Sequence, residues 1–361
     1  MKQEKRVKVG IVGAGKRAET THLPLLNKLR DLFEVIGFTT RSESTAIKFH
    51  NASSLKYFDS ISSLVSEEPE LLVCCVSGDA MFDVLSEVLS HDVPVLVETP
   101  IADPRLISLE SSCNTPMGVF EQWPRLPLEQ FKSHLYNLAI FDRPFLVKND
   151  CRSFNYHAVA QLRNYLGRES LPISAYGVIN PINTPAFKDN NGSVREENEI
   201  WDHGIVRFSN GAILSYDFSY HCKTAPFRSL QTLRAYSKNG TITTGKNFSA
   251  GDDFQILDFR CLEGSDTRNM DIRVLRNDSG LPIRIWDEVT KVYWKSEFKN
   301  EDLTEQEIAI ASIYRDMREV IMENKSSACL YSCRDAYIDY IIMAGIQHSA
   351  QTGAVVSFNG S

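Results

Sequence analysis

Short apolar runs alternate with amphipathic stretches over the first third of the chain. Runs of strand length, rich in β-branched residues, occupy residues 7–12, 34–37, 71–76, 93–97 and 117–120. Apolar residues recur at helical spacing in the intervals, as at Leu25, Leu26 and Leu29. Parallel strands need a crossover of a dozen or more residues, so this alternation predicts a doubly wound parallel sheet with helices on both faces.

The pattern changes after about residue 122. Apolar spacing predicts helices over residues 130–138, 157–166, 305–322 and 336–349. It predicts strands over 145–155, 174–179, 200–208, 212–220, 229–236, 241–244 and 355–358. Asn210-Gly211 and Asn239-Gly240 separate successive strand runs and are strong hairpin signals, so we expect a large, mostly antiparallel open sheet. Residues 246–300 are weakly patterned, and we expect irregular strands and loops there.

The fold class is therefore α/β, with two domains. Residues 1–122 are expected to form a dinucleotide-binding Rossmann domain, and residues 123–361 a substrate-binding and oligomerisation domain. The C-terminal helices are able to pack back on the first domain. A length of 361 residues agrees with two domains, because one domain takes up roughly 150 residues.

Composition narrows the function classes. A net charge of −7 argues against a nucleic-acid partner, since there is no basic excess to displace counterions from phosphates. No run approaches the roughly 20 apolar residues of a membrane span, and with no apolar leader the cytoplasm is the expected compartment. The eight cysteines form no CxxC pair, so we expect neither a metal site nor a disulfide framework.

A glycine-rich turn follows the first strand run and precedes helical spacing, the context in which a dinucleotide fingerprint is meaningful. Gly13 permits a tight turn, Gly15 lets the backbone approach a pyrophosphate, and Ala18 is small enough for close helix–strand packing. The N–H groups at the start of the helix then face the phosphates. The predicted contacts in this turn are Gly13, Ala14, Gly15, Lys16, Arg17 and Ala18.

The end of the second strand run bears on the choice of coenzyme. An acidic residue there would bind the ribose diol of NAD, but this chain has Thr40, Arg41 and Ser42. A guanidinium with neighbouring hydroxyls suits a 2′-phosphate, so NADP is favoured over NAD. In the alternative interpretation Arg41 is only a solvated loop charge.

Several motifs together resemble the Gfo/Idh/MocA family of NAD(P)-dependent oxidoreductases. They are the VGIVGAG segment at 9–15, His22-Leu23-Pro24, the VLVETP segment at 95–100, the helix around His157 that ends at Gly167, the FSNGA hairpin at 208–212 and the AYSKNGTI segment at 235–242. The resemblance implies a Rossmann domain and a mixed α/β domain, with the active site in the cleft between them. It also implies that the open sheet pairs subunits, as a homodimer or homotetramer.

The chain departs from the family pattern at catalytic positions. Where sugar and polyol dehydrogenases of the family have the lysine of Glu-Lys-Pro, this chain has Thr99. The helix that usually carries aspartates beside its histidine has Ser153 and Ala160, and only His157 remains. A neutral threonine does not stabilise a developing alkoxide as an ammonium does.

Three functions stay open from these residues. The first is an NADP(H)-dependent reductase of a C=N, conjugated or carbonyl group in a small biosynthetic intermediate, because such a substrate carries or delocalises its own charge. The second is an ordinary sugar or polyol dehydrogenase with a replacement acid. The third is a catalytically inactive protein that binds the coenzyme as a sensor or scaffold, as some regulatory relatives do.

His157 is the expected proton donor, because an imidazole titrates near neutral pH, and Tyr156 is the second candidate. Ser77, Glu98, Thr99 and Pro100 are expected beside the coenzyme at the ends of their strands. Trp123 and Arg125 follow the last strand run and are expected to bind substrate, with a structural role at the domain junction as the alternative.

Overall fold

The computed structural model describes residues 5–76, 78–153, 155–183, 187–188, 192–195, 198–219, 231–244, 254–258, 268–298 and 302–358. The chain forms two compact units. The first comprises Met1–Arg125 and Asp302–Tyr337, and the second Leu126–Glu301 and Ile338–Ser361. The folding domains 1–122 and 123–361 stay a prediction.

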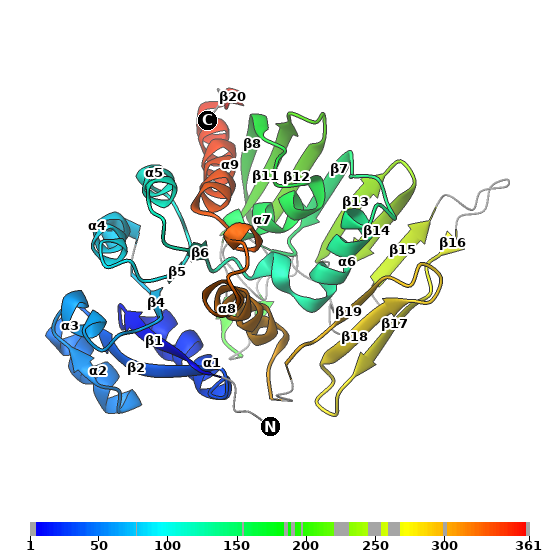
Figure 1. Ribbon diagram of the computed structural model, residues 1–361. Coiled ribbons are helices and arrows are strands. Elements are labelled where there is room, and N and C mark those ends of the chain that lie inside the picture. Colours follow the sequence, from blue (N-terminus) through cyan, green and yellow to red (C-terminus); the bar gives the residue numbers. More distant parts are fainter. Residues whose placement is uncertain are drawn as a thin grey trace. The chain divides into compact units, whose positions relative to one another are not determined.

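The first unit is built on a six-stranded parallel sheet (Figure 1). In spatial order its strands are β3 (Tyr57–Phe58), β2 (Phe33–Thr39), β1 (Val7–Val12), β4 (Leu71–Cys74), β5 (Val95–Val97) and β6 (Met117–Val119). The chain order reverses between β1 and β4, which creates the crevice where doubly wound sheets bind ligands. This confirms the predicted Rossmann sheet, to which the structure adds the two-residue strand β3.

Helices connect these strands or follow the last of them in the same unit, and caps explain where several helices begin. They are η1 (Ala18–His22), α1 (Leu23–Lys28), α2 (Glu43–Ser53), α3 (Ile61–Val65), α4 (Gly78–Leu89), α5 (Arg105–Ser112), η2 (Trp123–Arg125), α8 (Glu305–Glu323) and η4 (Ser327–Cys329). Ser42 caps α2 by accepting a hydrogen bond from the Thr45 amide. Thr304 and Glu307 form a reciprocal capping box at the start of α8.

The second unit contains a nine-stranded sheet. Its spatial order is β16 (Arg268–Asn269), β15 (Phe254–Asp258), β14 (Gly240–Thr244), β13 (Thr232–Ser237), β7 (Leu146–Asp150), β12 (Ile213–Ser219), β11 (Asn198–Phe208), β8 (Pro172–Asn183) and β20 (Val356–Ser357). Only β7 and β12 pair in parallel among these described neighbours, so the predicted open, mostly antiparallel sheet is confirmed.

The predicted strand over 145–155 was too long. β7 ends at Asp150 because Cys151 takes a left-handed φ of 53°, which breaks the extended backbone, and α7 (Asn155–Leu166) begins soon after. The stretch expected to be irregular contains an ordered three-stranded antiparallel sheet. Its strands are β17 (Ile272–Arg276), β18 (Pro282–Asp287) and β19 (Tyr293–Lys295). A further short pair joins β9 (Phe187–Lys188) to β10 (Val194–Arg195).

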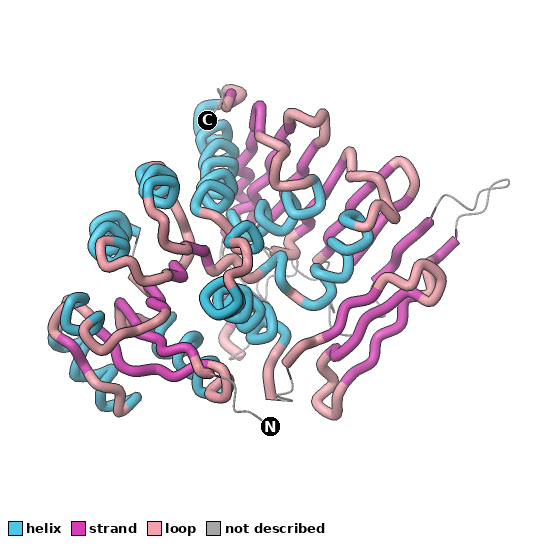
Figure 2. The backbone as a smooth tube through the Cα atoms, in the orientation of Figure 1, coloured by secondary structure: helices cyan, strands magenta, loops and turns pink. Residues whose placement is uncertain are grey.

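Helices cover one face of the large sheet, as Figure 2 shows for α6 (Pro127–Asn137), α7 and most of α9 (Cys333–Thr352). Side chains of β13 alternate accordingly, with Leu233 and Ala235 fully buried. At Gly177 the backbone of α9 comes so close that a Cβ atom would lie 2.1 Å from the carbonyl oxygen of Ile346. Only glycine permits that contact.

A fully buried ion pair links α6 to its surroundings in the second unit. The Lys132 ammonium lies 2.6 Å from Glu129 and donates to the Thr244 hydroxyl at 2.8 Å, and Tyr165 donates to Glu129. Burial lowers the pKa of Lys132 to about 8, although the neighbouring carboxylate acts in the opposite direction. With no solvent near it, this lysine contributes to packing and not to an open site.

We expect Lys132→Met to lower the free energy of unfolding by about 3–5 kcal/mol, because it leaves a buried carboxylate without its cation. Adding Glu129→Gln should restore most of the loss, since an amide oxygen still accepts from Tyr165 and no charge stays buried. Urea unfolding followed by circular dichroism measures both variants. A double variant as unstable as the single one would contradict this account.

Candidate nucleotide site at the edge of the parallel sheet

The glycine turn has the geometry that a bound pyrophosphate requires. Gly13 has φ +93°, its amide donates to the Thr39 carbonyl at 2.8 Å, and a Cβ there would lie 2.6 Å from the carbonyl oxygen of Cys75. At Gly15, by contrast, a Cβ would meet no atom within 4 Å. The first glycine is therefore needed for the fold, and the second leaves open space above the backbone. These residues fit a dinucleotide whose phosphates approach Gly15.

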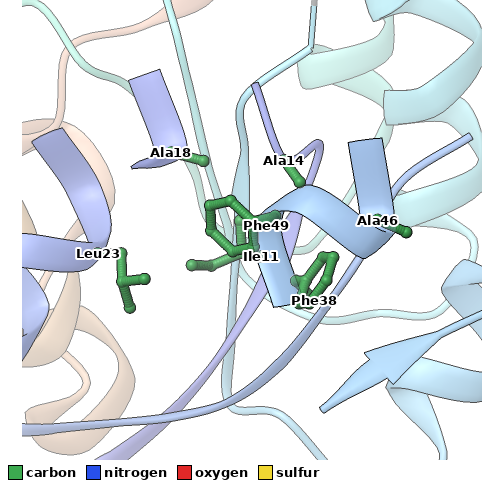
Figure 3. Packing of buried hydrophobic residues seen from close by; sticks show 7 residues of the cluster. All are labelled: Ile11, Ala14, Ala18, Leu23, Phe38, Ala46 and Phe49. Atoms are coloured by element: carbon green, nitrogen blue, oxygen red, sulfur yellow. The ribbon is translucent and has the colours of Figure 1, made fainter. Parts of the chain in front are cut away.

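Small residues hold the turn against its neighbours. Ala14 and Ala18 lie in a buried cluster with Ile11, Phe38 and Phe49, shown in Figure 3. Ala18 is completely buried, so a larger side chain there would push the helix away from the strands. This is the helix–strand packing role expected for the third small position of the fingerprint.

The end of β2 lies next to this turn. Thr40 is half-buried and Arg41 exposed, and Ser42 caps the helix that follows. Among the residues that the structure describes, no acidic side chain forms an ion pair with Arg41 or with Lys16 in the turn. Both cations are thus available to an anion.

The helix after the turn contains a π-helical segment, η1, in which the amide of Leu23 donates to the carbonyl of Ala18 five residues earlier. In an α-helix, side chains five positions apart point about 140° away from each other. A turn closed by i→i+5 bonds instead brings such residues closer to the same side of the helix. Arg17 and His22 are five positions apart, and both reach the same carboxylate, that of Glu98.

Glu98 is the centre of a buried polar network. It accepts from Arg17 Nη2 at 2.7 Å and from His22 Nε2 at 2.6 Å, and His22 Nδ1 lies 2.8 Å from the Tyr314 hydroxyl of α8. Burial alone would raise the pKa of Glu98, but the hydrogen bond and charge of His22 and the ion pair with Arg17 outweigh it and lower that pKa. The carboxylate therefore stays ionised.

The position of Glu98 orients the residues that follow it in the sequence. Its second carboxylate oxygen accepts from the Thr99 amide at 3.2 Å, Thr99 and Pro100 are half-buried, and the peptide bond between them is cis. Glu98 thus points inward and orients this loop. The role of these three residues beside a coenzyme stays a prediction, and Ser77 lies outside the described residues.

The Arg125 guanidinium is bound by other groups of the protein. Its guanidinium lies 2.7 Å from the Asp316 carboxylate and donates to the Cys329 carbonyl at 2.7 Å, both within the first unit. The amide of Trp123 donates to Glu121. These contacts favour the structural alternative for Arg125, whereas the substrate-binding role of Trp123 and Arg125 stays a prediction.

The predicted proton donors lie on α7 in the second unit. His157 is 7% exposed and packs against the ring of Tyr156, with the ring centroids 4.3 Å apart. Ser153, at a family aspartate position, donates from its hydroxyl to Gln161 at 2.7 Å and from its amide to Asn149 at 3.0 Å.

Sequence reasoning missed the network behind the turn. It placed Arg17 on the phosphates, whereas the structure pairs Arg17 with Glu98, and it gave no role to Tyr314. His22-Leu23-Pro24 was noticed as a motif, but its partner is 76 residues away in the sequence. Apolar periodicity carries no signal for such a contact.

A glycine turn at the reversal point of a doubly wound sheet defines a dinucleotide-binding protein. Residues 7–111 match the Gfo/Idh/MocA model, described as an oxidoreductase family with an NAD-binding Rossmann fold. This match lies in the first third of the chain and confirms the resemblance to this family of NAD(P)-dependent oxidoreductases that its motifs show.

A segment of 128 residues, 33% of this chain, is 27% identical to the uncharacterized protein YMR315W of Saccharomyces cerevisiae and spans 37% of that protein. The whole fold is similar to that of an oxidoreductase from Thermotoga maritima, with a TM-score of 0.65, 18% identity and 98% of each chain covered. It is also similar to the WlbA dehydrogenase from Bordetella pertussis in complex with NADH and UDP-GlcNAcA, with a TM-score of 0.65 and 14% identity over 99% of this chain and 100% of the other.

We expect Glu98→Gln to lower the free energy of unfolding by about 1–3 kcal/mol at pH 7, because an amide loses the charge that holds Arg17 and His22. Since the pKa of Glu98 is lower in the folded than in the unfolded chain, its contribution is present above pH 4.5 and is lost as the pH falls. The difference between wild type and variant should therefore shrink as the pH falls below 4.5 in urea titrations.

Glu67→Gln is the matched control, since Glu67 forms an exposed pair with Lys56 in the same unit. Its effect should stay below about 1 kcal/mol at every pH. Equal losses in the two variants would contradict the buried role of Glu98.

Proposed function

We propose that this protein is an NADP(H)-dependent reductase of a C=N bond, or of a conjugated or carbonyl group, in a small biosynthetic intermediate. The observation that carries the proposal is Thr99, a neutral residue held by its amide on an inward-facing carboxylate at the place where sugar dehydrogenases of the family have an ammonium. A protonated imine carries its own positive charge, so hydride addition to it requires no ammonium from the protein.

The residues of the first unit have the features needed to hold the coenzyme. Gly13, Ala14 and Gly15 present backbone to the pyrophosphate, Lys16 adds a cation, and Thr40, Arg41 and Ser42 suit a 2′-phosphate. The reduced nicotinamide, when bound, supplies the hydride. Glu98 fixes the loop of Thr99 and Pro100, and the protein thereby shapes the pocket without adding charge to it.

His157 supplies the proton in this proposal. The largely buried His157 imidazole, when protonated, donates one proton, either to the imine nitrogen before hydride addition or to the carbonyl oxygen during it, and regains a proton from solvent, with Tyr156 as its neighbour. The substrate carbon receives the hydride, and its heteroatom receives the proton, so charge and electrons balance.

Two alternatives remain testable. An ordinary polyol dehydrogenase would oxidise sugars with NADP at useful rates, and an inactive sensor would bind NADPH but consume none with imines, enones, carbonyls or polyols. The proposed reductase instead consumes NADPH with imines or enones. We also propose that subunits pair through their open sheet faces as a homo-oligomer. The proposed compartment is the cytoplasm. Among the described residues no helix is long and apolar enough to cross a bilayer.

We expect purified protein to bind NADPH more tightly than NADH, and Arg41→Ala to reduce NADPH affinity about tenfold while changing NADH affinity less than twofold. Quenching of protein fluorescence on titration measures all four constants. A tenfold preference for NADH in the wild type would overturn the assignment of NADP.

We expect His157→Ala to lower turnover by about 100-fold or more, because a positioned proton donor contributes a factor of that order. NADPH affinity should change less than twofold, since His157 lies on the second unit and the glycine turn on the first. Turnover is followed as NADPH absorbance over a panel of cyclic imines and enones. Tyr156→Phe tests the second candidate donor in the same assay, and activity of His157→Ala within a few-fold of wild type would refute the role of His157.

A further inference from the structure

A hollow of about 390 Å³ opens beside the glycine turn. Ala14 and Gly15 contribute to its lining. Lys16 and Glu19 line it from the helix that follows the turn, and Thr45 and Lys48 from α2. Each of these two pairs is three positions apart, so each helix directs one face into the hollow.

The lining is basic although the chain is acidic. Two lysines face one glutamate in the hollow, whereas the whole chain has a net charge of −7. Lys48 lies 3.5 Å from Glu19, and its side chain is 75% exposed, so this ion pair is weak and easily exchanged. The described part of the chain gives Lys16 no acidic partner at all.

The hollow borders the predicted 2′-phosphate site. Ser42, at the end of the β2–α2 turn, accepts from the Thr45 amide at 3.4 Å, and Thr45 lines the hollow. Ala14 and Gly15 belong both to the hollow and to the turn that faces the pyrophosphate. We therefore expect an adenosine that runs from the pyrophosphate towards Arg41 to lie beside the hollow.

We propose that Lys48 binds the 2′-phosphate of NADP(H) beside Arg41, and that Glu19 sets the discrimination by competing for Lys48. The inference rests on the proposed coenzyme. A ribose with a free 2′-hydroxyl leaves the Lys48–Glu19 pair in place. A doubly charged phosphate exchanges Lys48 from Glu19 to itself, and the Glu19 carboxylate then opposes the phosphate by like-charge repulsion.

This arrangement gives the two residues opposite effects on one ligand. Removing Lys48 takes away an attraction to the 2′-phosphate, which NADPH has and NADH lacks. Neutralising Glu19 removes both the competitor for Lys48 and a repulsion, so it strengthens the same binding. A lysine that acts only through the net charge of the domain would change NADPH and NADH affinity in parallel.

The test titrates wild type, Lys48→Ala and Glu19→Gln with NADPH, NADH, adenosine 2′,5′-bisphosphate and 5′-AMP by calorimetry. Lys48→Ala should weaken NADPH and the bisphosphate about tenfold, and Glu19→Gln should tighten both about threefold. NADH and 5′-AMP should change less than twofold in either variant. Lys56→Ala is the control, since Lys56 also pairs with a surface glutamate but does not line the hollow.

Three results would overturn the inference. The first is equal weakening of NADPH and NADH in Lys48→Ala. The second is weaker, or unchanged, binding of NADPH by Glu19→Gln. The third is competition by inorganic phosphate as effective as that by the bisphosphate, which would indicate a site for free phosphate.

The outcome separates this inference from the proposed function. If Arg41→Ala abolishes the preference for NADPH and Lys48→Ala leaves it intact, the assignment of NADP is supported and the role of Lys48 is refuted. If the wild type binds neither coenzyme, both the proposed function and this inference are refuted.

Discussion

The close approach of three strands at Gly13 is the constraint on which the first unit depends. The Gly13 amide bonds to the end of β2, and the carbonyl of Cys75, which follows β4, lies where a side chain would have to be. Only a residue without a Cβ satisfies both contacts. These two contacts of Gly13 fix the position of Gly15, of the helix after it and of the end of β2.

A second constraint ties the turn to the loop after β5. The Glu98 carboxylate is nearly buried and is held from two sides by Arg17 and His22, while its other oxygen orients the Thr99 amide. An ionised group in such a place is tolerated only with close partners. The glycine turn and the Thr99 loop are consequently parts of one rigid assembly, to which α8 contributes Tyr314.

Much of this architecture was predictable from the sequence because it has local causes. The parallel sheet followed from the alternation of apolar runs and helical spacing, and the β11–β12 hairpin from Asn210-Gly211, where Gly211 has φ +84°. The glycine turn was predictable because its residues are contiguous.

The unpredicted features depend on contacts between distant segments or on a single backbone angle. Nothing near Arg17 in the sequence indicates that Glu98 takes up its charge, and nothing near position 129 indicates that Lys132 is buried beside it. The early end of β7 depends on the left-handed backbone of Cys151, a residue type that gives no warning of it. The β17–β19 sheet was not predicted, because β17 alternates half-buried and exposed side chains and has no clear apolar face.

The π-helical segment has a consequence for comparing this chain with others. One additional residue between positions 18 and 22 turns every side chain before it by about 100° relative to those after it. A chain without that residue would keep the phosphate turn yet direct a different side chain at the carboxylate after β5. Spacing between glycines and histidine, and not only their presence, therefore decides whether two such chains share the same inner network.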